Sequence, residues 1–144
     1  MLQHYSPYKV AENFNVLAAL APGRVDLGVG KAPGGLPLST RALQQGLNQQ
    51  EKGSFAEQLA QLDRWIRPEH QSHAEAVRAT PLPPLPAEGF LLGASIDSAL
   101  LAAGLGWHFV FAAHPTGAPE LLREVVSNGR QNRARDVSVA VQAV

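Results

Sequence analysis

Residues His4 to Gly35 read HYSPYKVAENFNVLAALAPGRVDLGVGKAPGG, which predicts a helix, a tight turn and a buried strand that leads into a glycine-rich loop. The helix begins after Ser6 as N-cap, with Pro7 at its first position, where the missing N–H of proline costs nothing. Pro22-Gly23 ends it, and the alternating residues from Val25 to Gly30 are typical of a strand. Because no strand precedes this helix, we expect the chain to be an interior piece of a larger α/β fold.

The predicted elements alternate between helix and strand. In the first helix, Val10, Phe14, Leu17 and Ala21 fall on one face and are expected to be buried. After it come the strand at 25–30, a short helix capped by Ser39 or Thr40 and reaching Leu47, a helix over 55–66 with a capping box of Ser54 and Glu57, a strand at 90–92, a helix over 96–103, a strand at 107–113, a helix over 119–126 and a strand at 137–141. This order is typical of a parallel sheet covered by helices, here about four strands, or half of a (β/α)8 barrel. A doubly wound sheet is the alternative.

The composition is that of one soluble domain over residues 1–144. Hydrophobic residues make up 45%, and the 12 basic residues equal the 12 acidic ones. Without net charge or a long run of one sign, neither nucleic acid nor a membrane is an expected partner. The absence of cysteine excludes disulfides, thiolate metal sites and cysteine nucleophiles. The apolar stretch Gly89 to Ala113 contains Asp97 and divides at Gly104 and Gly106, so we interpret it as strand, helix and strand rather than a membrane span.

A proline-rich segment, residues 67–88, interrupts this order and is predicted to be an extended surface excursion within the domain. Within it, His70 and His73 resemble a metal pair, but no rigid frame holds them, and we expect no metal site. Residues Arg78 to Pro84 fit the basic-x-x-Pro-x-x-Pro form of a polyproline II peptide that docks in aromatic grooves. A stiff spacer is the other interpretation.

The glycine loop after the first strand does not fit the known nucleotide motifs. The run from Gly28 to Gly34 is one residue too long for the dinucleotide fingerprint, and Pro33 lies where its helix must begin. For a P-loop, Val25 stands at the first glycine, and Ala32 replaces the Ser or Thr that would hold magnesium. Both motifs are therefore excluded.

A stronger candidate site is the passage from strand to helix at Gly93-Ala94-Ser95-Ile96-Asp97-Ser98-Ala99. A helix N-terminus has free N–H groups, and Ser95 and Ser98 add two hydroxyls one turn apart, which suits a phosphate. The alternative is that Ser95 only caps its helix. Asp97 favours this alternative, because it complements the helix dipole by itself and would repel a bound dianion.

Two further residues follow strands and are candidates for the same site. Lys31, directly after Gly30, can supply positive charge, since the strands of one barrel bring their carboxyl ends to the same face. His114, just past the strand at 107–113, can act as a hydrogen-bond donor or proton carrier. A solvated lysine and a histidine bonded to the local backbone are the alternatives.

Four phrases of the chain resemble the luciferase-like flavin-dependent monooxygenases: HYSPYKVAE, APGRVDLGVGKAPGG, FLLGAS followed two residues later by SA, and GWHFVFAAH. The resemblance extends from Leu2 to about Arg123 and is weakest between Gln45 and Pro86. It implies a (β/α)8 barrel of which this chain holds strands four to seven and the helix before them. The resemblance also implies that family members have further sequence before and after this part. One of those additional segments contains a Glu-His-His motif that lines the flavin pocket.

The resemblance implies that oxygen and reduced FMN, supplied by a separate reductase, oxidise a small organic substrate such as an aldehyde. Ser95 and Ser98 match the family's phosphate-binding hydroxyls. Lys31 falls where an arginine usually follows the strand end at Gly30, and Ala94 falls where the family usually has another polar side chain. Lysine keeps the charge but loses the bidentate fork, so we expect weaker flavin binding than in a typical member. The resemblance assigns no catalytic residue, and His114 stays a candidate.

The expected partners are a small-molecule substrate, flavin and a second copy of the chain, because a half barrel exposes sheet edges that invite pairing. A cytoplasmic protein is expected, since the N-terminus lacks the apolar region of a signal peptide. Two other functions stay open at this point. One is a non-catalytic flavin- or phosphate-binding protein that dimerises through these edges, and the other is a scaffold that presents residues 78–86 as a proline-rich peptide.

Overall fold

The computed structural model describes residues 1–31, 37–44, 51–67, 69, 77–113, 123–125, 127 and 137–141. The chain divides into two compact units. The first comprises Met1–Leu27 and Lys31–Ala87, and the second comprises Gly28–Gly30 and Glu88–Val144.

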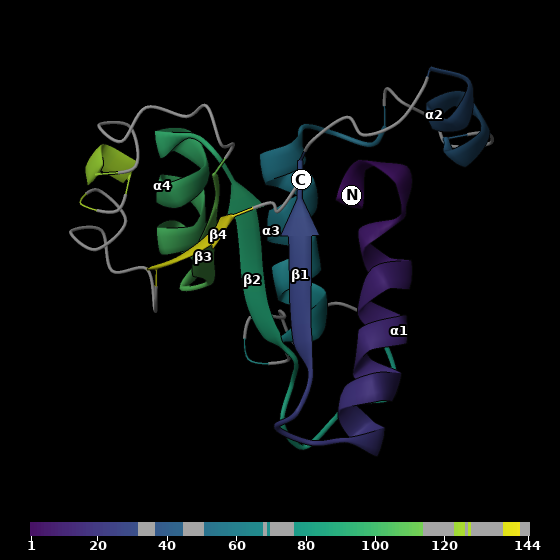
Figure 1. Ribbon diagram of the computed structural model, residues 1–144. Helices are drawn as coiled ribbons and strands as arrows, with labels where there is room; N and C mark the ends of the chain where they lie inside the picture. Colours follow the sequence, from purple (N-terminus) through teal and green to yellow (C-terminus); the bar gives the residue numbers. More distant parts are fainter. Residues whose placement is uncertain are drawn as a thin grey trace. The chain divides into compact units, whose positions relative to one another are not determined.

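The elements appear in the predicted order (Figure 1). They are η1 (Leu2–His4), α1 (Pro7–Leu20), β1 (Asp26–Gly30), α2 (Pro37–Leu43), α3 (Phe55–Ile66), β2 (Glu88–Gly93), α4 (Ile96–Leu105), β3 (His108–Ala113) and β4 (Val137–Val141). Within the described residues, one sheet has the strand order β1-β2-β3-β4, and the pairs β2–β3 and β3–β4 are parallel. The predictions of an α/β fold and of a parallel sheet are confirmed.

In the first unit, α1 and α3 pack against each other, and η1 packs on α3 (Figure 1). Tyr8 of α1 meets Trp65 of α3 edge to face, with the ring centroids 5.2 Å apart. The capping box of α3 is formed as predicted: the Ser54 hydroxyl accepts from the Glu57 N–H at 3.3 Å, and the Glu57 carboxylate accepts from the Ser54 N–H at 2.6 Å. Both ends of α3 therefore lie where the sequence predicted them.

The buried side of α1 differs from the prediction. The buried residues are Ala11, Asn15 and Ala18, whereas Leu17 of the predicted face is 48% exposed. The other predicted residues, Val10, Phe14 and Ala21, are only partly buried. Small side chains bring a helix close to its neighbours, so the contact follows alanine rather than the larger apolar residues.

Two predicted helix starts also need correction. Ser6 is the N-cap of α1 by position, but its side chain makes no capping hydrogen bond. The short helix α2 begins at Pro37, before Ser39 and Thr40, so neither of these residues caps it. Proline is favourable at such a start because the first N–H groups of a helix have no partner. The predicted end at Leu47 lies outside the described residues.

The second half of the proline-rich segment is bonded to α1. Tyr8 Oη donates to the carbonyl of Arg78 at 3.1 Å, and Asn15 Nδ2 donates to the carbonyl of Ala79 at 2.8 Å. Ala79 and Pro83 are buried, while Leu82 and Leu85 are among the exposed apolar residues. Two hydrogen bonds, to the carbonyls of Arg78 and Ala79, thus join this part of the segment to α1.

In the second unit, α4 covers one face of β2 and β3 (Figure 1). Leu91, Phe109 and Phe111 are buried on that face, because successive side chains of a strand point to opposite sides. Gly106 ends α4 in the left-handed conformation, with φ +65°. The apolar stretch from Gly89 to Ala113 is thus strand, helix and strand, as predicted. Among the described helices, none is long and apolar enough to cross a membrane.

The predicted helix over 119–126 lies mostly outside the described residues, of which 123–125 and 127 are helical.

Candidate functional site

The turn from β2 into α4 places two serine hydroxyls next to each other. Ser95 is the N-cap of α4 with an extended backbone, φ −130° and ψ 157°. Its Oγ accepts from the N–H of Ser98 at 3.2 Å and lies 3.0 Å from the Ser98 Oγ. The predicted capping role of Ser95 is confirmed, and the two hydroxyls that sequence reasoning selected are brought together.

Gly93 makes this arrangement possible. A Cβ at position 93 would lie 2.6 Å from the Cβ and 2.7 Å from the Oγ of Ser98. Real side-chain contacts are longer than this, so Ser98 can sit over the end of β2 only where residue 93 has no side chain. The last residue of β2 therefore fixes the position of a hydroxyl in α4.

The start of α4 carries groups that favour an anion and one that opposes it. The N–H groups of Ile96 and Asp97 lie in the first turn, where the helix offers no carbonyl to accept from them. Ser95 and Ala94 are exposed, and Ser98 is half-buried. Asp97 is exposed in the same turn, where it complements the helix dipole and would repel a bound dianion, as the sequence indicated. Two hydroxyls and free N–H groups together can bind a phosphate or a similar group.

Capping by Ser95 and anion binding do not exclude each other. A serine hydroxyl has one hydrogen to donate and two lone pairs to accept with. The bond from the Ser98 N–H uses one lone pair of the Ser95 Oγ. The hydroxyl hydrogen stays available for the neighbouring hydroxyl or for a ligand.

Gly28 and Gly30 of β1 lie beside Leu92 of β2. A Cβ at Gly28 would lie 3.5 Å from Cδ1 of Leu92, and a Cβ at Gly30 would lie 3.8 Å from the carbonyl oxygen of Leu92. Both distances are ordinary van der Waals contacts, so the described protein atoms do not require glycine at either position. Lys31 follows Gly30 and is exposed.

Three histidines considered from the sequence, His114, His70 and His73, lie outside the described residues. Within the part of the chain that the structure describes, no group of three or more His, Cys, Asp or Glu side chains could hold a metal ion.

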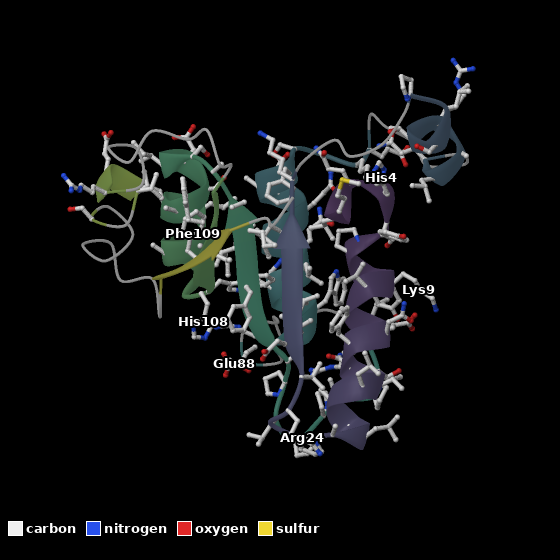
Figure 2. All side chains as sticks on the ribbon, in the orientation of Figure 1. His4, Lys9, Arg24, Glu88, His108 and Phe109 are labelled. Carbon is white, nitrogen blue, oxygen red and sulfur yellow. The ribbon has the colours of Figure 1, made fainter. Side chains whose placement is uncertain are left out.

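A cluster that sequence reasoning missed lies at the start of β2 and β3. His108 Nε2 is 3.5 Å from Glu88 Oε2 (Figure 2). The imidazole also stacks on the Phe90 ring, with the ring centroids 4.4 Å apart. The parallel register that pairs Phe90 with His108 produces this stack, and it could be found only with the register known. Because the Glu88 side chain is about half exposed, its contact with His108 contributes little to stability. In parallel β/α folds, sites form at the carboxyl ends of the strands, so this cluster lies at the other end from Ser95.

No family model matches the chain, but individual proteins do. It is 48% identical over 126 residues to the N-acetyl-S-alkylcysteine monooxygenase of Bacillus subtilis, which covers 86% of this chain and 37% of that protein. It is 36% identical over 137 residues to a luciferase-like monooxygenase of Escherichia coli, which covers 92% of this chain and 38% of that protein. The chain thus spans well under half the length of these curated relatives.

Two solved structures have a similar fold. Apo-MsnO8 superposes with a TM-score of 0.75 at 30% identity, covering 98% of this chain and 42% of that one. An F420-dependent secondary alcohol dehydrogenase, solved with an F420-acetone adduct, superposes with a TM-score of 0.58 at 18% identity over 95% of this chain and 44% of that one. At that identity the second match shows the fold alone. In both comparisons, nearly the whole of this chain matches less than half of the larger protein.

Proposed function

Since the chain belongs to the luciferase-like monooxygenase family, a family of oxidoreductases, we propose that it binds the phosphate of reduced FMN through Ser95 and Ser98 and takes part in the oxygenation of a small organic substrate. The observation that carries the proposal is the hydroxyl pair at the start of α4, with the oxygens 3.0 Å apart. Nearly the whole chain aligns with the curated relatives, so the proposal covers the part of their fold that this chain supplies.

The residues at the start of α4 fit a phosphate monoester. The two serine hydroxyls and the first-turn N–H groups of Ile96 and Asp97 are donors, and a phosphate is an acceptor with several oxygens. Gly30 and Lys31 complete the proposed cofactor contacts at the end of β1, with the lysine supplying the positive charge. Ala94 can contact the phosphate only through its backbone, so we expect weaker phosphate binding than a polar side chain at this position would give.

When bound, reduced flavin supplies the electrons that activate oxygen, chemistry that no amino-acid side chain provides. The contribution of this chain is to hold the phosphate end, so that the ring takes one orientation. A deazaflavin such as F420, named in the more distant structural match, is the alternative cofactor. The hydroxyl pair fits a phosphate on either molecule.

The substrate we propose is an N-acylated, S-alkylated amino acid. The name of the relative at 48% identity supports it, because that protein acts on N-acetyl-S-alkylcysteines. Such a compound has a thioether for oxidation and a carboxylate and an amide for recognition. We propose this class of substrate in place of the aldehyde that the family resemblance alone implied.

We also propose self-association through the sheet. Among the described strands, β1 and β4 each have a single neighbour in the sheet. Leu92 of β2 is 41% exposed. Unpaired strand edges and exposed leucines favour pairing with another chain.

The experiment is a titration of the purified chain with FMN, followed by flavin fluorescence, for the wild type and for Ser95→Ala/Ser98→Ala. We expect saturable binding that the double variant weakens by roughly tenfold or more, because hydrogen bonds to a charged group are lost. Riboflavin, which lacks the phosphate, should bind both proteins equally. An equal affinity of both proteins for FMN would contradict the proposal.

The control is Ser54→Ala. It removes a serine N-cap from α3 that, like Ser95, accepts from the N–H three residues later, and we propose no cofactor there. It should lower the stability by about 1 kcal/mol and leave FMN binding unchanged. If Ser54→Ala also weakens FMN binding, the weaker binding of Ser95→Ala/Ser98→Ala would be explained by impaired folding rather than by lost contacts to the phosphate.

A further inference from the structure

Asp97 is the acidic residue in the first turn of α4, the same turn to which the proposed function assigns a phosphate. Its side chain is exposed, and in the described part of the chain no basic side chain forms an ion pair with it. A carboxylate without a cation repels a second anion placed beside it. Asp97 therefore bears on which kind of phosphate this turn can bind.

The groups that can donate to a ligand at this turn are neutral. The N–H of Ser98 is bonded to the Ser95 Oγ, and the N–H of Ala99 is bonded to the Ser95 carbonyl. The N–H groups of Ile96 and Asp97 stay available, together with the serine hydroxyls. The turn thus offers hydrogen bonds to a phosphate but no full positive charge to offset the carboxylate.

The side chains assigned to the proposed site carry no net positive charge. Lys31, at the end of β1, supplies one positive charge, and Asp97 supplies one negative charge. A phosphate monoester such as that of FMN carries about two negative charges at neutral pH, whereas a phosphate diester carries one. The repulsion from Asp97 is therefore about twice as strong for the monoester as for the diester.

The short distance across one helical turn sets the size of the effect. An aspartate side chain is short, so its carboxylate lies about 6 Å from groups bound at the same turn. At that separation in water, each negative charge on a ligand weakens binding roughly threefold. The separation is shorter than the Debye length of ~10 Å at 0.1 M salt, so dissolved ions screen the repulsion only in part.

We propose that Asp97 sets the charge preference of the site: it weakens the binding of a doubly charged phosphate monoester and favours a singly charged phosphate diester. The inference rests on the proposed function, because it requires a phosphate at the start of α4. In this assignment Ser95 and Ser98 supply the contacts, and Asp97 determines the specificity. Removal of the carboxylate should strengthen binding in step with the negative charge of the ligand.

The test compares three flavins that differ in charge. Riboflavin is neutral, the methyl ester of FMN carries a singly charged phosphate diester, and FMN carries the monoester. Flavin fluorescence gives the affinity of each for the 144-residue chain and for Asp97→Asn. We expect the variant to bind FMN roughly tenfold and the methyl ester roughly threefold more tightly than the wild type, with no change for riboflavin. A change that does not follow the charge of the flavin, or no change at all, would overturn the inference.

Two further variants and a salt series show whether charge is the cause. Asp97→Glu keeps the charge and should behave as the wild type does. Asp26→Asn removes another exposed carboxylate, at the start of β1, and should change none of the three affinities. At about 1 M salt the Debye length falls to about 3 Å, so the gain in Asp97→Asn should nearly disappear. A gain that persists at this salt concentration would overturn the inference.

The stability of the variant gives an independent check. Asp97 complements the helix dipole, so Asp97→Asn should melt slightly below the wild type in the absence of flavin. Tighter binding of FMN by a less stable protein then reflects lost repulsion rather than a better-formed helix. If Asp97→Asn melts above the wild type and binds all three flavins more tightly, the inference is wrong.

The serine double variant separates this inference from the proposed function. Weaker FMN binding by Ser95→Ala/Ser98→Ala without a charge-dependent gain in Asp97→Asn would overturn this inference alone. A charge-dependent gain in Asp97→Asn without an effect of the serine variant would support a phosphate at this turn and contradict the assignment of the hydroxyls. If the wild type and Asp97→Asn bind neither FMN nor its methyl ester, both proposals are wrong.

Discussion

Gly89 of β2 lies directly against the indole of Trp107. A Cβ at position 89 would overlap Cδ2 and Cε2 of that ring, and Trp107 is fully buried just before β3. The first residues of β2 therefore leave a space that the largest side chain of the second unit fills. Because the indole has no room to move in a packed interior, the pair fixes how β2 and the start of β3 approach each other.

Gly89→Ala should destabilise the protein by about 1–3 kcal/mol, the cost of adding a methyl group to a filled core. Gly104→Ala is the control, because a Cβ at Gly104 in α4 meets nothing within 4 Å. Alanine is the better residue inside a helix, so this variant should be more stable by about 0.5–1 kcal/mol. Urea unfolding of both variants measures the two effects. Equal stability of the two alanine variants would show that the indole moves aside.

The capping box of α3 should make stability depend on pH. The Ser54 backbone N–H, and then its side chain, hold the pKa of Glu57 below the ordinary value of 4.5. A carboxylate with a lowered pKa stabilises the fold above its unfolded value and loses that contribution as the pH falls through the folded value. Glu57→Gln should therefore melt below the wild type near neutral pH, and the gap should narrow as the pH falls below 4.5. A gap of constant size across this range would contradict the ionic role of Glu57.

Helix α3 shows what the sequence could predict and α1 shows what it could not. Ser54 and Glu57 act within one turn, so local sequence was sufficient to place the start of α3. In α1, the buried residues are alanines and an asparagine, and Leu17 faces outward. Periodicity of large apolar residues cannot detect a contact made by small ones, because that contact depends on the neighbouring element.

The contacts at the candidate site and elsewhere also differ in how well the sequence alone predicts them. The hydroxyls of Ser95 and Ser98 were predictable, because a strand followed directly by a serine-capped helix is a local pattern. Outside that site, the hydrogen bond between Gln44 and His4 was not predictable, because it joins residues 40 positions apart in the sequence. The stack of His108 on Phe90 likewise requires the register between β2 and β3. Sequence reasoning therefore found the part of the site that lies within one turn.

Asn15 should prove important for holding the proline-rich segment on α1. Its Nδ2 donates to the Ala79 carbonyl at 2.8 Å in a buried position. Asn15→Ala leaves that carbonyl unpaired and should cost about 1–3 kcal/mol. Asn13→Ala, at an exposed position of the same helix, should change stability by less than about 0.5 kcal/mol. Limited proteolysis should cut residues 77–87 faster in the first variant only, and equal cutting rates would contradict the link.

The close approach of Gly93 and Ser98 allows packing and cofactor binding to be separated. Gly93→Ala should lower both stability and FMN affinity, because the added Cβ displaces Ser98, whose Cβ lies 2.6 Å from its position. Adding Ser98→Gly to this variant removes the colliding atoms and should restore part of the lost stability. It also removes a hydroxyl that we propose binds phosphate, so FMN affinity should stay low while riboflavin affinity recovers. Chemical unfolding and fluorescence titration of the same samples measure both quantities, and recovery of full FMN affinity in the double variant would show that Ser98 contributes only packing.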